Sequence, residues 1–190
     1  MVLFRLLERM VPRGCMRLAV DQRGFYPAGG GQVTVDVTPA PQVQGLELLD
    51  RGVIRAVRGI VYAGGPGRKA AKDVAQQLRA SLRQELGAAV PIDITVDAEA
   101  GKSKKPKPSA PASGDDAPLT SRQRRELSME VRANKSGACG CLLVIETSTG
   151  CLIPGDSLCE GTEIHAQEVS TKAVARLLEA WRSGGAVCEV

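Results

Sequence analysis

The stretch CLLVIETSTGCLI, residues 141–153, decides how this chain folds. Residues 142–145 form an uninterrupted apolar run, which is typical of a strand at the centre of a sheet. Gly150 marks a turn, and Cys151-Leu152-Ile153 follow it as an apolar segment that can pair back on the first strand. The stretch therefore predicts a β-hairpin whose first strand is buried.

Helical periodicity appears on both sides of this hairpin. Residues 68–86 carry an apolar stripe that ends at Gly87, and residues 165–182 carry a second stripe that ends at Gly184-Gly185. The stripes consist of Ala71, Val74, Leu78, Leu82 and Leu86 in the first helix and of Val169, Ala173, Val174, Leu177, Leu178 and Trp181 in the second. Each stripe needs an apolar surface to cover, and a sheet supplies one.

Two further strands complete the predicted sheet. Residues 53–62 are rich in β-formers, with Gly59 as the site of a bulge, and residues 92–97 alternate between apolar and polar side chains. The order of elements predicts an α+β fold, in which a small mixed β-sheet carries two helices on one face. Spacing alone leaves open whether the strands after the first helix run parallel or antiparallel.

The first forty residues carry a shorter pattern. Residues 3–11 fit a short helix and residues 16–20 fit a strand. In residues 32–38, Val33, Val35 and Val37 alternate with polar side chains, as in a half-buried strand. We expect these valines to face solvent or to pair with another chain along an open edge, since no predicted element of this chain covers them.

The segment 99–137 interrupts the pattern. The run KSKKPKPSAPASGDD has no apolar periodicity, and we interpret residues 99–120 as disordered. Residues 99–135 contain nine basic and five acidic side chains, so this segment accounts for the whole net charge of +4. We interpret the basic run Lys102–Lys107 as part of a solvated linker, with contact to RNA phosphates or a nuclear import signal as alternatives. Aromatic residues make up only 3% of the chain, which disfavours a single-strand binder that stacks bases.

The six cysteines predict no metal site. None forms a Cys-x-x-Cys pair, and His165 is the one histidine available to help them. We expect reduced thiols in an intracellular protein, and a surface position for His165 at the start of the last helix. Charged residues interrupt the N-terminal segment, so it does not resemble a signal peptide, and no apolar run is long enough to cross a membrane. No membrane partner is expected.

The glycine-rich loop RGFYPAGGG, residues 23–31, is the sharpest local motif. Consecutive glycines expose backbone N–H groups and allow a phosphate or another strand to approach closely. Arg23, Gly29, Gly30 and Gly31 are therefore candidate phosphate or backbone contacts. A strand follows the loop instead of a helix, so the alternative is a bulge or a tight turn.

Several motifs together resemble the RNA 3'-terminal phosphate cyclase family. GFYPAGGGQV resembles the signature that precedes the inserted domain of these enzymes, and LLVIETSTGCLIPGDSL resembles their Glu-Thr-Ser-Thr-Gly hairpin. RGVIRAVRGIVYAG, GRKAAKDVAQQL and the helix from Glu168 to Gly185 follow in the family's order. The family signature covers Gly24, Phe25, Tyr26, Pro27, Glu146, Thr147, Ser148, Thr149 and Gly150.

The resemblance implies a division of the chain. Residues 1–40 correspond to part of a βαβαββ-type repeat of the cyclase body, residues 41–98 and 138–190 to the insert domain and its return helix, and residues 99–137 to a basic insertion. Because Phe25, Tyr26, Pro27 and Cys151 are kept, the chain resembles the true cyclases more than the cyclase-like proteins of ribosome biogenesis. We expect it to be a partial sequence of such an enzyme.

The resemblance also implies a function. The complete enzyme is a ligase of RNA processing that uses ATP and Mg²⁺ to convert an RNA 3'-phosphate into a 2',3'-cyclic phosphodiester through adenylylated intermediates. Its nucleophilic histidine is expected downstream of Val190, so this chain alone should bind neither cofactor and be inactive. RNA 3' ends are the expected partner, without DNA specificity, and the nucleus is the expected location. The alternatives are a noncatalytic module of RNA processing or ribosome biogenesis and a stand-alone binding domain with a basic arm.

Overall fold

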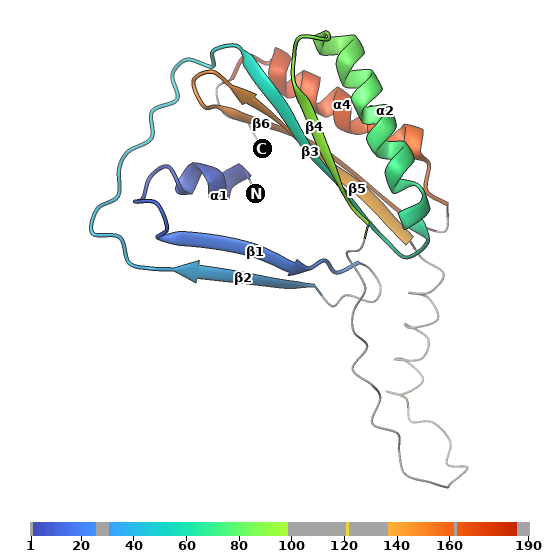
Figure 1. Ribbon diagram of the computed structural model, residues 1–190, viewed down its shortest axis with the longest axis horizontal. Helices are drawn as coiled ribbons and strands as arrows, with labels where there is room; N and C mark the ends of the chain where they lie inside the picture. The colour runs from blue at the N-terminus through green and yellow to red at the C-terminus, as the bar shows by residue number, and fades with distance from the viewer. Residues whose placement is uncertain (1, 26–30, 99–120, 122–136, 162, 186–190) are drawn as a thin grey trace, which may run out of the picture.

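The structure is a computed structural model that describes residues 2–25, 31–98, 121, 137–161 and 163–185 (Figure 1). Its larger sheet has four strands in the order β4-β3-β5-β6. The strands are β3 (Ile54–Gly64), β4 (Ile92–Asp97), β5 (Gly137–Thr147) and β6 (Leu152–Gly161). The apolar run of residues 142–145 lies in β5, which has a neighbour on each side, so the predicted central strand is confirmed.

The sheet is mixed, which answers the question of direction that the sequence left open. β3 and β4 are parallel, whereas β5 is antiparallel to both β3 and β6. A parallel pair needs a crossover, and the helix α2 (Ala71–Leu86) supplies it after a 3₁₀ turn at Gly65–Lys69. Gly87 ends α2 with a φ of 83°, as the sequence predicted.

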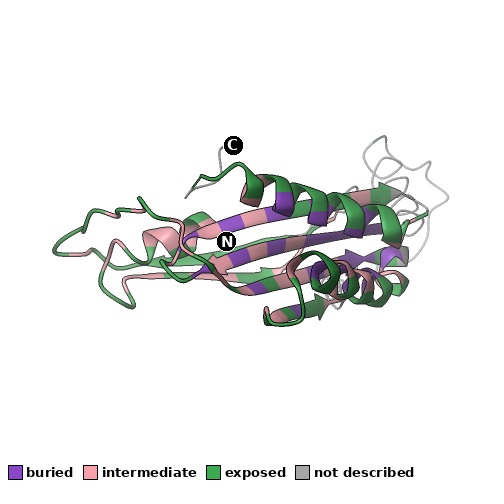
Figure 2. Cartoon of the chain, turned by 90° about the horizontal axis from the view of Figure 1, so that it is seen from above, coloured by how far each residue is buried: buried purple, intermediate pink, exposed green. Residues whose placement is uncertain are grey.

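The helices α2 and α4 (Ala166–Arg182) cover one face of this sheet, in agreement with the predicted fold class (Figure 1). Their stripes and the facing strand residues form one core, and the strands alternate between buried and half-exposed positions (Figure 2). The largest fully buried side chains are Leu78, Leu82, Leu143, Ile145, Ile153 and Leu177. Because the helices supply a second layer, each strand places one of its two rows of side chains in this core.

Gly59 does not form the bulge that its sequence predicted. It pairs regularly with Leu143, and the register shift of β3 lies between Ile54 and Ala56. A Cβ at position 59 would lie 2.8 Å from Cδ2 of Leu143. Glycine at this position lets the Leu143 side chain pack close to the β3 backbone, which is another common reason for glycine inside a strand.

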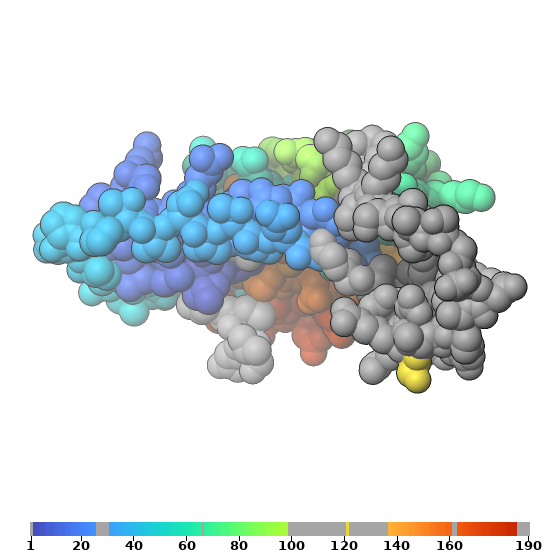
Figure 3. Space-filling model, turned by 90° about the horizontal axis from the view of Figure 1, so that it is seen from below, coloured from blue at the N-terminus to red at the C-terminus, as the bar shows by residue number. Residues whose placement is uncertain are grey.

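The N-terminal part lies on the opposite side of the sheet. The helix α1 (Val2–Leu7) is shorter than the predicted 3–11, and it stands between the sheet and a two-stranded hairpin of β1 (Met16–Gln22) and β2 (Gln32–Val37) (Figure 1). The hairpin forms an outer ridge on this side (Figure 3). Val33, Val35 and Val37 are exposed, so the expectation that they face solvent is confirmed. The predicted disorder of residues 99–120 falls outside the described residues.

Candidate functional site

The Glu-Thr-Ser-Thr-Gly motif forms a tight turn between β5 and β6. The Thr147 hydroxyl accepts a hydrogen bond from the backbone N–H of Cys151 at 3.0 Å, and the N–H of Gly150 donates to the carbonyl of Thr147 at 3.1 Å. Gly150 has a φ of 86°, which favours glycine. The threonine side chain and the glycine backbone therefore fix the shape of this turn from within.

The same turn holds the segment that leads into β3. The N–H of Ser148 donates to the carbonyl of Val53 at 2.9 Å, and the Ser148 hydroxyl accepts from the N–H of Val53 at 3.1 Å. The Thr149 hydroxyl donates to the carbonyl of Arg51 at 2.8 Å. The hydroxyl groups of the motif thus replace a regular strand pairing and clamp residues 51–53 against the hairpin.

Arg51 joins the beginning of the domain to its end. Its guanidinium group lies 3.8 Å from the centroid of the Trp181 ring and donates a hydrogen bond to the Trp181 carbonyl. These residues are 130 positions apart. A guanidinium stacked on an indole is the strongest cation–π arrangement, so the contact fastens the last turn of α4 to the segment that enters β3.

Glu146, the first residue of the motif, forms its contacts outside the turn. Its carboxylate accepts from Arg5 at 2.8 Å and from Arg58 at 3.0 Å. Arg9 donates to the carbonyl of Gly150 at 2.6 Å. The sequence could not reveal these pairs, because Arg5 and Arg9 are each 141 residues away from their partners. The motif therefore has an inner side that shapes the hairpin and an outer side that receives two arginines from the N-terminal segment.

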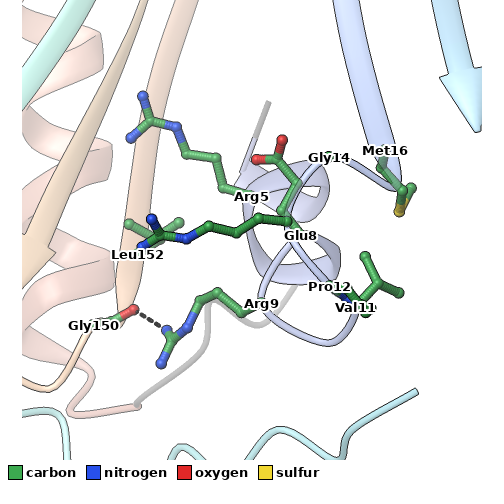
Figure 4. A pocket seen from close by; sticks show the side chains of 10 residues that line it. Arg5, Glu8, Arg9, Val11, Pro12, Gly14, Met16, Gly150 and Leu152 are labelled. Atoms are coloured by element: carbon green, nitrogen blue, oxygen red, sulfur yellow. Dashed lines mark hydrogen bonds between the residues drawn. The ribbon is translucent and has the colours of Figure 1, made fainter. Parts of the chain in front are cut away.

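A cavity of about 570 Å³ opens where this segment meets the turn (Figure 4). Arg5 and Arg9 extend from the N-terminal segment toward the strand end that carries Gly150 and Leu152 (Figure 4). Arg9 forms the one hydrogen bond drawn in that view, to Gly150. The cavity is consequently bounded by arginine side chains on one side and by the signature turn on the other.

Arg23, the first residue of the glycine-rich loop, contacts the other end of the sheet. Its Nε donates to Asp97 at 3.0 Å, and its guanidinium lies 4.8 Å from the centroid of the Tyr62 ring. Burial is the main cause that raises the pKa of Tyr62, while the charge of Arg23 opposes the rise. Because Asp97 and Tyr62 already engage it, Arg23 serves here as an anchor between the hairpin and the sheet.

Phe25 and two glycines of the loop show why small residues are needed there. The Phe25 ring packs so closely on Gly64 that a methyl group at position 64 would collide with it. A Cβ at Gly31 would lie 3.0 Å from the backbone nitrogen of Gly24. This is the close approach of two backbone segments that the sequence offered as one interpretation. Tyr26, Pro27, Gly29 and Gly30 lie outside the described residues, and a phosphate contact of the loop stays a prediction.

Buried thiols face the helices from β5. Cys139 and Cys141 are fully buried, and burial raises the pKa of Cys139 to about 11 and that of Cys141 to about 12. His165 precedes α4 with its side chain 66% exposed, which agrees with the predicted surface position. Among the described residues, no group of three or more histidine, cysteine, aspartate or glutamate side chains is placed to hold a metal ion. In the same part of the chain, no helix has the length and apolar character to cross a membrane.

Comparison with known proteins agrees with the motifs. Residues 49–182 match the family described as RNA 3'-terminal phosphate cyclase (RTC), insert domain. The RNA 3'-terminal phosphate cyclase of Koribacter versatilis is 45% identical over 49 residues, which are 26% of this chain and 13% of that protein. The enzyme of the same name from Hyperthermus butylicus is 37% identical over 81 residues, which are 42% of this chain and 22% of that protein. The matches thus span less than a quarter of each relative's length.

Proposed function

This chain belongs to the family of the RNA 3'-terminal phosphate cyclase insert domain, and from that premise we propose that it supplies this domain to an ATP-dependent RNA 3'-phosphate cyclase. The reaction is the conversion of an RNA 3'-phosphate into a 2',3'-cyclic phosphodiester, in which the neighbouring 2'-hydroxyl attacks the activated phosphate. RNA 3' ends are the proposed substrate, RNA processing the proposed process and the nucleus the proposed location.

The closure of residues 51–181 upon themselves is the observation that supports a role as an insert. Arg51 stacks on Trp181, and the signature turn clamps residues 51–53, so the polypeptide enters and leaves this domain at one place. A domain whose ends meet can be accommodated within another domain without disturbing it. The core of this unit is also self-contained, because both helices and all four strands contribute to it.

The chemical step is assigned to parts of the enzyme other than the described residues. ATP, when bound to the complete enzyme, supplies the adenylyl group that activates the phosphate. Among the described residues no group of three or more histidine, cysteine or carboxylate side chains gathers for a metal ion, and the proposal assigns no Mg²⁺ ligand to them. His165 is exposed beside Glu163 at 4.0 Å and lines neither the cavity of about 570 Å³ nor the smaller cavity of about 210 Å³. The proposed chemistry therefore lies outside the described residues.

Placement in the true-cyclase branch is part of the proposal. Phe25 is retained and packs on Gly64, and Cys151 is buried with its thiol 3.6 Å from the carbonyl of Asp50. Both residues thus fill positions where a larger or more polar side chain would disturb the contact between the signature and the sheet. A noncatalytic module has no active site, so it would not need the contacts of Phe25 and Cys151 to hold one in place.

A chimera tests the proposed function. Residues 49–182 replace the insert domain of the Koribacter versatilis enzyme, and cyclisation of a 3'-phosphorylated oligoribonucleotide is measured with ATP and Mg²⁺. We expect cyclisation to be retained. A chimera that folds, judged by the emission of Trp181 and by circular dichroism, but forms no cyclic phosphate would favour the noncatalytic alternative.

The isolated chain provides the complementary measurement. Incubation of the 190-residue protein with labelled ATP and Mg²⁺ should leave no label on the protein after denaturing electrophoresis. Acid-labile label on the chain would mean that the nucleophile lies within these 190 residues, which would contradict the assignment of the chemistry to other parts of the enzyme.

A further inference from the structure

The cavity between the N-terminal segment and the signature turn has an excess of positive charge in its lining. It is lined by Arg5, Glu8, Arg9, Arg13 and six small or apolar residues that include Gly150 and Leu152 (Figure 4). Three guanidinium groups therefore meet one carboxylate within the lining. Guanidinium groups present several N–H donors in a planar fork, which suits the oxygens of a phosphate.

The nearest additional carboxylate does not restore the balance. Glu146 lies beside the cavity, but it is shared by Arg5 at 2.8 Å and Arg58 at 3.0 Å. Arg9 donates to the Gly150 carbonyl, which is polar but uncharged. Neither Arg9 nor Arg13 takes part in an ion pair within the part of the chain that the structure describes. Within the described residues, these two positive charges are left without a carboxylate partner, which suits an anion.

The rest of the lining suits the phosphate and sugar of a nucleotide better than its base. Val11, Pro12, Met16 and Leu152 provide an apolar floor, and no aromatic side chain lies among the lining residues. Stacking on aromatic rings, the usual way to hold an unpaired base, is therefore not available here. The volume of about 570 Å³ is within the range of ligand sites, so a phosphate with its sugar fits beside the floor.

We propose that this cavity holds the phosphate backbone of single-stranded RNA, with Arg9 and Arg13 as the phosphate contacts. Arg5 ties the N-terminal side of the cavity to the hairpin through its ion pair with Glu146, and the hydrogen bond to the Gly150 carbonyl orients Arg9. The cavity exists only where the N-terminal segment meets the signature turn, which gives the turn a role in placing RNA beside the insert domain. The choice of RNA as the source of the phosphate rests on the proposed function, whereas the affinity for phosphate rests on the arginines.

The test uses the 190-residue chain and a short fluorescent oligouridylate. Binding is measured by anisotropy over a series of salt concentrations, because each phosphate contact to a single strand contributes a slope of about −0.7 in log K against log[salt]. We expect the double variant Arg9→Ala/Arg13→Ala to bind more weakly and to reduce the slope by about 1.4, the sum for two contacts. Arg9→Lys/Arg13→Lys keeps both charges and should restore most of the slope.

Lys72→Ala/Arg83→Ala is the matched control, because it also removes two positive charges. Both residues are exposed on α2, on the helical side of the sheet, and neither lines the cavity. Arg9 and Arg13 are also exposed, so their variants should keep the circular dichroism and Trp181 emission of the parent. The control should leave the slope of the parent unchanged. If RNA bound only through the basic segment 99–135, the Arg9→Ala/Arg13→Ala variant would leave the slope unchanged as well.

Two results would overturn the proposal. An equal slope in the Arg9→Ala/Arg13→Ala variant and the Lys72→Ala/Arg83→Ala control would show that the cavity does not contact RNA. Displacement of the oligouridylate by inorganic phosphate as efficiently as by unlabelled RNA would show a site for the free ion. Either result can occur while the chimera remains active in cyclisation, so failure here and failure of the proposed function are distinguishable.

Discussion

The two sheets of this molecule both carry valines on one face, but only the larger sheet buries them. Val57 and Val61 of β3 are 0% exposed, whereas Val33, Val35 and Val37 of β2 are 56%, 53% and 64% exposed. The valines of β2 are two residues apart and those of β3 are four apart, so each set lies on one face of its strand. In the larger sheet that face receives α2 and α4 (Figure 2), whereas in the hairpin the three valines stay exposed.

The difference shows that alternation selects a face but does not provide a partner for it. A two-stranded hairpin is marginally stable in water by itself, and a helix layer or further strands must supply the missing burial. The hairpin is instead tied down at single points, by Arg23 to Asp97 and by Phe25 on Gly64. We therefore expect the two sheets to respond very differently to the same perturbation.

Hydrogen exchange should give the largest contrast. Amides in residues 53–62 and 141–147 should exchange only through global unfolding, because these strands lie in the centre of the sheet. Amides in residues 16–20 and 32–38 should exchange much faster through local opening. Equal protection in the two regions, measured by mass spectrometry or NMR, would show that the hairpin is an integral part of the larger domain.

Truncation of a buried side chain should destabilise the larger sheet alone. Leu177→Ala removes a fully buried side chain from α4 and should lower the free energy of unfolding by about 2–5 kcal/mol. Val35→Ala, in the hairpin, should change it by about 0.5 kcal/mol or less, since the side chain is already exposed. Urea unfolding followed by Trp181 emission measures both, and a similar loss in the two variants would contradict the comparison.

The rate of cysteine alkylation should be higher beside the hairpin than in the core of the larger sheet. The pKa of Cys139 is raised to about 11, so at pH 8 its thiolate fraction is about a hundredfold below that of an ordinary thiol with a pKa of 9. Cys15, which is partly exposed before β1, should react with iodoacetamide before the buried Cys139 does. Peptide mapping identifies the order, and rapid labelling of Cys139 in folded protein would mean that β5 opens readily.

The raised thiol pKa values also fix a direction for stability against pH. The folded state favours the protonated thiols of Cys139 and Cys141. Below the ordinary pKa of 9, both thiols are protonated in the folded and the unfolded chain, and the free energy of unfolding keeps its full value. As the pH rises from 9 toward 11 and 12, the unfolded chain loses its protons first and the free energy of unfolding falls. Substitution of both cysteines by alanine should flatten this alkaline decline.

Overpacking provides a smaller but well-defined test. A Cβ at Gly155 would lie 2.6 Å from the backbone nitrogen of Leu177, so Gly155→Ala must push β6 and α4 apart. We expect a loss of about 1–3 kcal/mol. Gly45→Ala is the control, because nothing lies within 4 Å of a Cβ added there. Thermal unfolding of the two variants should differ accordingly, and equal melting curves would show that the sheet and α4 adjust freely.

The anchor between the two regions should contribute least to global stability. Asp97→Asn removes the charge that pairs with Arg23 at a partly exposed position, so the free energy of unfolding should fall by about 0.2–1 kcal/mol. Exchange of amides in β1 should accelerate more than exchange in β3, because the change releases the hairpin and leaves the core intact. A uniform acceleration would mean that Arg23 stabilises the whole molecule.

Local periodicity determined the part of this protein that the sequence predicted correctly. The stripes of α2 and α4, the apolar run of β5 and the turn at Gly150 depend on neighbours within a few residues, and the sequence contains that information directly. The exposed valines of β2 followed from the same rule. The signature residues were identified by resemblance, but their contacts were not.

Tertiary structure decided the rest, since it depends on contacts between distant residues. Pro154-Gly155-Asp156-Ser157 has little strand propensity, yet it continues β6 because β5 offers a ladder of backbone partners. The direction of β4, the carboxylate of Glu146 between Arg5 and Arg58, and the stacking of Arg51 on Trp181 likewise leave no local pattern. Such pairs form only after the core has brought their strands and helices together, so only the folded structure shows them.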